Sequence, residues 1–175
     1  MNKNTYIQFR NGESMTILHS PIRILGFGSP IMGNDGVGLK VIEILKKEEF
    51  KELEGLDIED AGVCGLDLLN LLDGARKVII VDAILAGSPA GSVHRIEGRD
   101  LLKNAEFLPL ISVHDLTITD VLMIGEQVQT LPEIVVIGIE IGSRATEITR
   151  EISPDVFKGV DKAIRLIRKE VSSSL

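Results

Sequence analysis

Two uninterrupted apolar runs place the strongest constraint on the fold of this 175-residue chain. Residues 78–81 are all Val or Ile, and residues 134–139 are Val and Ile with one Gly. These runs end at Asp82 and Glu140. A strand that is apolar on both sides is typical of a parallel sheet whose two faces are covered by helices. We therefore expect both runs to be central strands of such a sheet.

The rest of the chain alternates between strand-like and helix-like patterns. Further strands are expected over residues 22–28, 56–60 and 92–97, the last as an edge strand because its polarity alternates. Helices are expected over residues 35–45, 65–74 and 117–129, and after Ser153, where Pro154 and Asp155 are typical of a first turn. This order predicts a single three-layer α/β domain over residues 1–175, with a mostly parallel sheet and helices on both faces. Residues 1–20 form an N-terminal extension that can add an edge hairpin through residues 6–9 and 15–18.

Composition argues against several classes of protein. The chain has 19 Lys and Arg against 26 Asp and Glu, no Trp and one Tyr, which disfavours nucleic acid as a partner. Its single Cys excludes a disulfide within the chain. The apolar runs are far shorter than a membrane span, and the first 14 residues lack the apolar region of a secretory signal. We therefore expect a cytoplasmic protein without membrane insertion.

A glycine-rich segment, GFGSPIMGNDGVG, follows the first predicted strand of the domain and covers residues 26–38. It begins like a dinucleotide-binding fingerprint, but Ile31 stands where the third glycine belongs, and no Gly-Lys-Ser/Thr follows. A tight strand-to-helix turn explains the glycines equally well. Asp35, however, adds a carboxylate at the carboxyl end of a strand, which is the edge where open α/β sheets bind ligands.

Two other side chains are candidates for the same edge. Asp82 ends a predicted strand, so it either caps the next turn or points into a crevice. His114 precedes a predicted helix and, taken alone, is more typical of capping or packing. Together with Asp35, these residues offer two carboxylates and one imidazole, a set that suits a borderline divalent metal. Their spacing permits such a site without establishing it.

The remaining histidines and the cysteine favour simpler interpretations. His19 and His94 are expected to be surface or packing residues. Cys64 lies in GVCGL, residues 62–66, at a strand-to-helix turn where a nucleophile elbow would present a thiol. Leu66 replaces the second elbow glycine, and a lone Cys more often packs as a small apolar residue. A nucleophilic Cys64 remains the minor alternative.

Taken together, four segments resemble the hydrogenase maturation proteases, which trim the C-terminal tail from the nickel-loaded large subunit of [NiFe] hydrogenases. They are LGFGSPIMGNDGVG (25–38), VIIVDA (78–83), SVHDLTITDVL (112–122) and EIVVIGIE (133–140), and the resemblance extends over about residues 22–167. It implies that Asp35, Asp82 and His114 are the catalytic and metal-contacting residues. It also implies that nickel is carried by the substrate and bound transiently, with the large-subunit precursor as partner.

Two segments depart from the family pattern. Ser29 stands where the family usually has Asn, and DAGVCG at residues 60–65 replaces an Asp-Gly-Gly-Thr-like stretch that is thought to help recognise the substrate. These departures bear on which hydrogenase is recognised more than on the reaction.

Two hypotheses of function follow. The first is an endopeptidase, in which either the metal polarises the scissile carbonyl or a carboxylate activates water. We expect the metal to polarise the scissile carbonyl, because the chain shows neither a Ser-His-Asp pattern nor a His-Glu-x-x-His zinc helix. The alternative is a non-catalytic module, either a metalloprotein chaperone or a Rossmann-like nucleotide binder, and the broken glycine fingerprint argues against the nucleotide.

Overall fold

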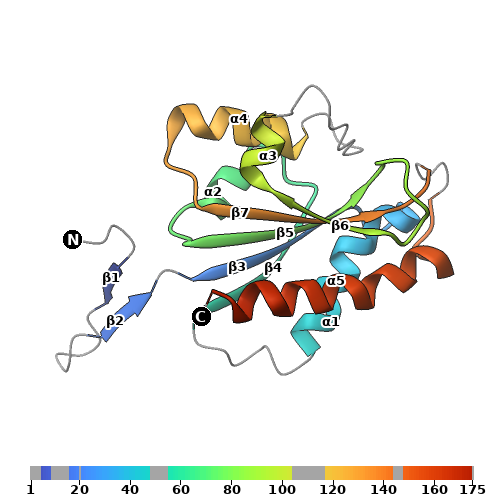
Figure 1. Ribbon diagram of the computed structural model, residues 1–175, viewed down its shortest axis with the longest axis horizontal. Helices are drawn as coiled ribbons and strands as arrows, with labels where there is room; N and C mark the ends of the chain where they lie inside the picture. Colours follow the sequence, from blue (N-terminus) through green and yellow to red (C-terminus); the bar gives the residue numbers. More distant parts are fainter. Residues whose placement is uncertain are drawn as a thin grey trace.

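A five-stranded sheet in the order β4-β3-β5-β7-β6 forms the centre of the computed structural model (Figure 1). The parallel strands are β3 (Ile22–Phe27), β4 (Leu56–Gly62), β5 (Lys77–Ile84) and β7 (Glu133–Glu140), and β6 (Val93–Glu97) is antiparallel at one edge. The structure describes residues 21–47, 55–103, 117–143 and 148–174, and the backbone of residues 5–8 and 16–19. The strands that end near Gly28, Asp82 and Glu140 are parallel neighbours, which confirms the predicted core of the sheet.

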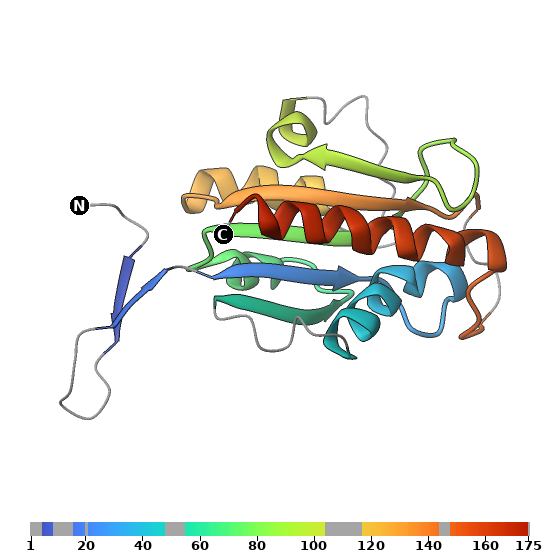
Figure 2. The ribbon, with the colours of Figure 1, turned by 60° about the horizontal axis from the view of Figure 1, so that its bottom comes forward.

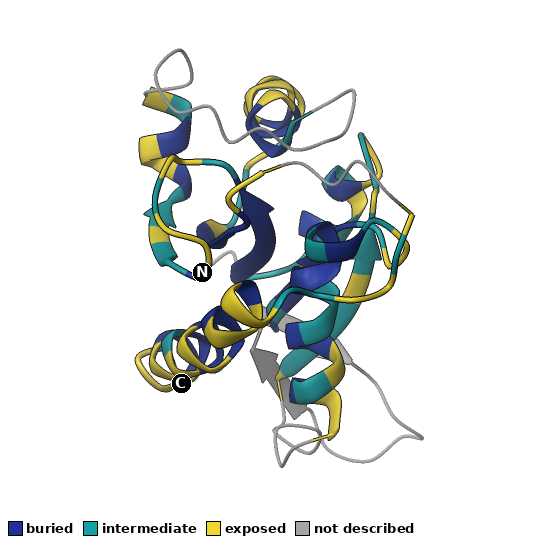
Figure 3. Cartoon of the chain, turned by 90° about the vertical axis from the view of Figure 1, so that its right-hand side faces the viewer, coloured by how far each residue is buried: buried dark blue, intermediate teal, exposed yellow. Residues whose placement is uncertain are grey.

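Helices cover both faces of this sheet, as predicted. On one face lie α1 (Val37–Lys47) and α5 (Pro154–Ser172), and on the other lie α2 (Leu68–Leu72), α3 (Gly98–Lys103) and α4 (Ile118–Val128) (Figure 1). Each face has its own apolar cluster, because alternate side chains of every strand point to opposite faces. Figure 3 shows the buried strands between helices whose outer sides are exposed. All eight residues of β5 are buried, as its apolar run predicts.

Helix starts follow the local sequence signals. Thr117 caps α4 in a reciprocal arrangement with Asp120, whose carboxylate accepts a hydrogen bond from the Thr117 backbone N–H. Ser153 is the N-cap residue of α5 and Pro154 begins the helix, as predicted. The Ser153 side chain makes no capping bond, and its backbone N–H instead donates to Asn34 Oδ1 at 2.7 Å. The start of α5 is thereby attached to the loop that follows β3.

Two element boundaries and the position of one hairpin differ from the sequence predictions. Strand β5 continues for two residues beyond Asp82 and ends at Ile84, because β7 continues to pair beside it. Helix α2 is limited to Leu68–Leu72, a shorter segment than the predicted 65–74. Strands β1 (Thr5–Gln8) and β2 (Thr16–His19) pair with each other in a separate two-stranded sheet and do not extend the main one (Figure 2).

A network of charges around the buried Lys77 and Glu170 closes the amino end of the sheet. Lys77, the first residue of β5, donates to Glu170 of α5 at 2.8 Å and also pairs with Glu133 at 2.9 Å. Arg95 of β6 donates through Nε to the other oxygen of Glu170 at 2.5 Å. The bonds from Arg95 and Lys77 outweigh the effect of burial and lower the pKa of Glu170 to about 2. This network joins the C-terminal helix to three strands.

Candidate active site

The loop between β3 and α1 holds Asp35 in a fixed, buried position. Asp35 lies in the 3-10 turn η1 (Gly33–Gly36), and it is 2% exposed. The backbone N–H of Ser29 donates to Asp35 Oδ2 at 2.7 Å. Gly28 has a φ of 122°, and a Cβ there would lie 1.9 Å from the carbonyl oxygen of Asp35. Only glycine therefore allows the chain to double back closely enough to place this carboxylate.

Close packing of α1 on the sheet brings the Asp35 loop to the end of β5. A Cβ on Gly38, in the first turn of α1, would lie 2.4 Å from the carbonyl oxygens of both Phe27 and Val81. The helix therefore starts directly against the carboxyl ends of β3 and β5, and η1 contacts β5. The glycines of the GNDGVG segment thus have a packing role as well as a turn role.

Asp82 lies on β5 in register with Gly138 of β7, and it is 5% exposed. Its Oδ1 accepts a hydrogen bond from the Ala83 N–H at 2.8 Å. Burial, with a smaller contribution from the negative charge of Asp35, raises the pKa of Asp82 to about 8 against the opposing effect of the Ala83 N–H. The structure thus brings together two of the three predicted site residues, Asp35 and Asp82.

The electrostatics of this pair favour a cation. Within the described part of the chain, neither Asp35 nor Asp82 forms a salt bridge. Two buried carboxyl groups close enough to interact electrostatically form a site where a bound cation would displace the proton that the raised pKa leaves on Asp82. His114, the third predicted member, lies outside the described residues, and among those described no three His, Cys, Asp or Glu side chains form a metal-binding group.

Cys64 and His94 have the surroundings of packing residues. Cys64 is half-buried and packs against the apolar cluster that includes α2, and burial raises the pKa of its thiol. A raised pKa disfavours the thiolate that a nucleophile requires. His94 is half-buried on the edge strand β6, where it pairs with Gly138. The side chain of His19 lies outside the described residues.

Sequence reasoning assigned no role to two polar residues near this edge. Glu140, the last residue of β7, accepts hydrogen bonds from the backbone N–H groups of Ala86 at 2.7 Å, Ser88 at 3.2 Å and Gly142 at 2.9 Å. It therefore holds the loop that follows β5. Asn34 holds the start of α5, as described above. A polar residue at the end of a buried strand was the available signal for Glu140.

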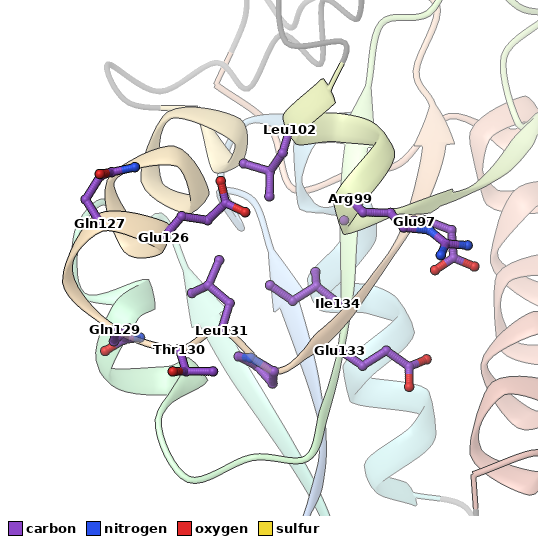
Figure 4. Close-up of a pocket in the computed structure, with 12 residues that line it drawn as sticks. Glu97, Arg99, Leu102, Glu126, Gln127, Gln129, Thr130, Leu131, Glu133 and Ile134 are labelled. Carbon is purple, nitrogen blue, oxygen red and sulfur yellow. The ribbon is translucent and has the colours of Figure 1, made fainter.

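Two hollows on the described surface lie at opposite ends of the sheet. One, of about 870 Å³, is lined by α3, α4 and the first residues of β7, including Glu97, Glu126 and Ile134 (Figure 4). It lies about 16 Å from the Asp82 row, because β7 rises about 3.3 Å per residue. The other, of about 640 Å³, is lined in part by Gly33 and Gly36 of η1 and is therefore beside the Asp35 loop.

No helix in the described residues is long and apolar enough to cross a membrane.

The fold and this edge define an α/β protein with a buried pair of carboxyl groups, and comparisons with known proteins identify the family. The model of the hydrogenase maturation protease family matches residues 39–170. A putative hydrogenase maturation protease of Methanocaldococcus jannaschii is 31% identical over 156 residues, which cover 86% of this chain and 96% of that protein. Protein FrxA of Pyrococcus furiosus is 29% identical over 78% of this chain and 94% of its own length.

Solved structures agree with this assignment at the level of fold. The hydrogenase maturating endopeptidase HybD from E. coli superposes with a TM-score of 0.74 at 22% identity, covering 88% of this chain and 93% of that one. The chain belongs to the hydrogenase maturation protease family. Its family is one of proteases, which are hydrolases, and this favours the predicted protease over the non-catalytic alternatives.

Proposed function

We propose that this protein removes the C-terminal tail from the nickel-loaded large-subunit precursor of a [NiFe] hydrogenase, in the cytoplasm. The observation that carries the proposal is the juxtaposition of Asp35 and Asp82, both buried at the carboxyl edge of the sheet with no salt bridge to a Lys or Arg among the described residues. Family membership supplies the reaction class, hydrolysis of a peptide bond in hydrogenase maturation.

In this proposal the nickel of the precursor is part of the substrate and serves as the recognition element. Asp35 and Asp82 supply carboxylate oxygens, and His114 supplies an imidazole nitrogen. This donor set lacks a thiolate, so it suits transient contact with a partly coordinated metal rather than permanent retention. Binding the nickel would place the two carboxylates beside the scissile peptide bond.

The reaction is hydrolysis, so water adds to the scissile carbonyl carbon and the C–N bond breaks. The products are a new C-terminal carboxylate on the large subunit and a tail with a free amino group. The metal polarises the carbonyl, and the carboxylates hold the metal and orient the attacking water. The Ser29 N–H and the tight Gly28 turn keep Asp35 in place during these steps.

The decisive experiment compares nickel-loaded with nickel-free precursor. Both forms are incubated with the enzyme, and the products are weighed by mass spectrometry. We expect the tail to be released from the loaded form only. Binding of the loaded precursor without release indicates a chaperone and contradicts the proposal, and cleavage of both forms contradicts the role given to nickel.

A further inference from the structure

The 640 Å³ hollow beside the Asp35 loop is a groove between α1 and the start of α5, and we call it the α1–α5 groove. Gly33 and Gly36 of η1 form part of its wall, so the turn that carries the buried Asp35 borders the groove. The groove therefore opens at the same sheet edge as the candidate site.

Backbone hydrogen bonds fix the far wall of the groove to the Asp35 loop. Thr149 donates its N–H to the Ile31 carbonyl at 2.9 Å and accepts from the Gly33 N–H at 2.7 Å, in a short parallel bridge. Asn34 adds the bond to Ser153 described above. Any chain bound in the groove is thus held at a set position relative to Asp35.

The lining combines apolar surface with an excess of negative charge. Phe157 of α5 is 42% exposed and lies in the groove together with Ile152. The cationic lining residues are Lys40 and Arg150, and the anionic ones are Glu43, Asp60 and Glu151. Lys40 is paired with Glu43 at 2.7 Å, which leaves one cation against two carboxylates.

We propose that the α1–α5 groove binds an extended segment of the precursor next to the scissile bond, mainly apolar and with one basic side chain. This inference rests on the proposed function and adds the subsite that holds the substrate chain. The apolar part lies on Phe157, where burial of an exposed aromatic ring contributes to binding. The basic side chain lies near Glu151 and Asp60, whose charges it complements.

The hollow at the other end of the sheet fits this role less well. It carries Glu97, Glu126 and Glu133, but two of these are already paired, Glu97 with Arg95 and Glu133 with Lys77. It also lies about 16 Å from the Asp82 row. A short substrate segment bound there would therefore not reach the carboxyl pair. It nevertheless provides matched control positions.

The test measures kcat and KM for processing of the nickel-loaded precursor by groove variants. Phe157→Ala and Glu151→Lys should each raise KM about tenfold or more while kcat changes little, because they remove binding and not chemistry. Glu151→Gln should have a smaller effect than Glu151→Lys. The controls are Met123→Ala, which truncates an apolar side chain on α4 that is 48% exposed, and Glu126→Lys in the other hollow. Both should leave KM unchanged.

Hydrogen–deuterium exchange of the unmodified enzyme gives an independent readout that does not depend on any variant folding. Precursor binding should slow exchange at residues 148–157 more than at residues 123–134. If the groove variants process the precursor with normal KM, or if Glu126→Lys alone raises it, the groove assignment is wrong while the proposed function stands. If the unmodified enzyme binds precursor without protecting residues 148–157, the groove assignment is also wrong. If it neither cleaves nor binds precursor, both proposals fail.

Discussion

The two ends of the central sheet each bury a carboxylate, in opposite electrostatic surroundings. At the amino end, Glu170 accepts hydrogen bonds from Arg95 and Lys77, and its pKa falls to about 2. At the carboxyl end, Asp82 has the Ala83 N–H and the like charge of Asp35 beside it, and burial raises its pKa to about 8. The first carboxylate is neutralised by cationic side chains, whereas the second is neutralised at neutral pH by its own proton.

This difference separates a group that stabilises the fold from one that the fold holds at a cost. Because a buried charge without a partner is unfavourable, Asp82 must take up a proton on folding, and this lowers the stability of the folded state at neutral pH relative to low pH. Such strongly shifted groups gather at functional sites, where an incoming ligand supplies the missing charge. We therefore expect the Glu170 end of the sheet to stabilise the fold and the Asp82 end to carry the reaction.

The largest expected effect is loss of tail removal in Asp35→Asn, Asp82→Asn and His114→Ala. An amide lacks the anionic oxygen, and alanine lacks the nitrogen, that a divalent ion requires. We expect cleavage to fall by about a thousandfold or more, a drop typical of removing a catalytic group. Mass spectrometry of the precursor products measures this directly.

The same variants sharpen the comparison through their stability. Asp82→Asn should raise the free energy of unfolding at pH 7 by about 0.5–2 kcal/mol, the gain common when a functional site loses an unfavourable group. If these residues only cap turns, their loss instead lowers stability by about 0.5–2 kcal/mol and spares cleavage. Thermal or urea unfolding of each variant distinguishes the two results.

Removing the carboxylate at the amino end of the sheet should lower the free energy of unfolding without affecting cleavage. Glu170→Gln leaves Lys77 buried without its main partner, so the free energy of unfolding should fall by about 3 kcal/mol. The matched control is Asp155→Asn, which removes the partner of Lys158 in an exposed pair and should change urea unfolding very little. Cleavage by the folded Glu170→Gln enzyme should be normal. Lost activity in fully folded Glu170→Gln would show that the amino end of the sheet also serves the reaction.

The two ends should also respond to pH with opposite signs. Glu170 has a folded pKa of about 2 against an ordinary 4.5, so its contribution is complete above pH 4.5 and is lost as the pH falls toward 2. Asp82 keeps its proton in the folded state up to about pH 8 but loses it near 3.8 when unfolded, so stability falls as the pH rises between these values. Urea unfolding of the metal-free protein at several pH values should show this decline in the unmodified chain and not in Asp82→Asn. Equal slopes in both proteins would contradict the assignment to Asp82.

Much of the fold was predictable because it depends on patterns local in sequence. The apolar runs that became β5 and β7 report burial on both faces, and Ser153-Pro154 marks a helix start whatever surrounds it. The pairing of β1 with β2 was predicted as a hairpin for the same reason, but its separation from the main sheet was not, because attachment to that sheet depends on contacts far apart in sequence.

The candidate site was predictable only in part, for the same reason. Asp35 and Asp82 were recognisable because each lies near the carboxyl end of a strand, and parallel strands share that edge. The close approach of α1 to the sheet at Gly38 depends on two carbonyl oxygens from different strands, which no local pattern contains. The α1–α5 groove likewise depends on the bridge between Met32 and Thr149, residues far apart in the chain.

The smallest effect is expected for Cys64→Ala, which lies near the chemical end of the sheet without belonging to the carboxylate pair. Its thiol is half-buried against the α2 side of the core, and burial raises its pKa, so it is a poor nucleophile. Cleavage should therefore remain within about twofold of the unmodified enzyme, while the lost sulfur contact lowers stability by about 1 kcal/mol or less. Precursor processing and urea unfolding measure the two effects separately. Loss of cleavage in a folded Cys64→Ala variant would contradict this assignment and favour the thiol as the nucleophile.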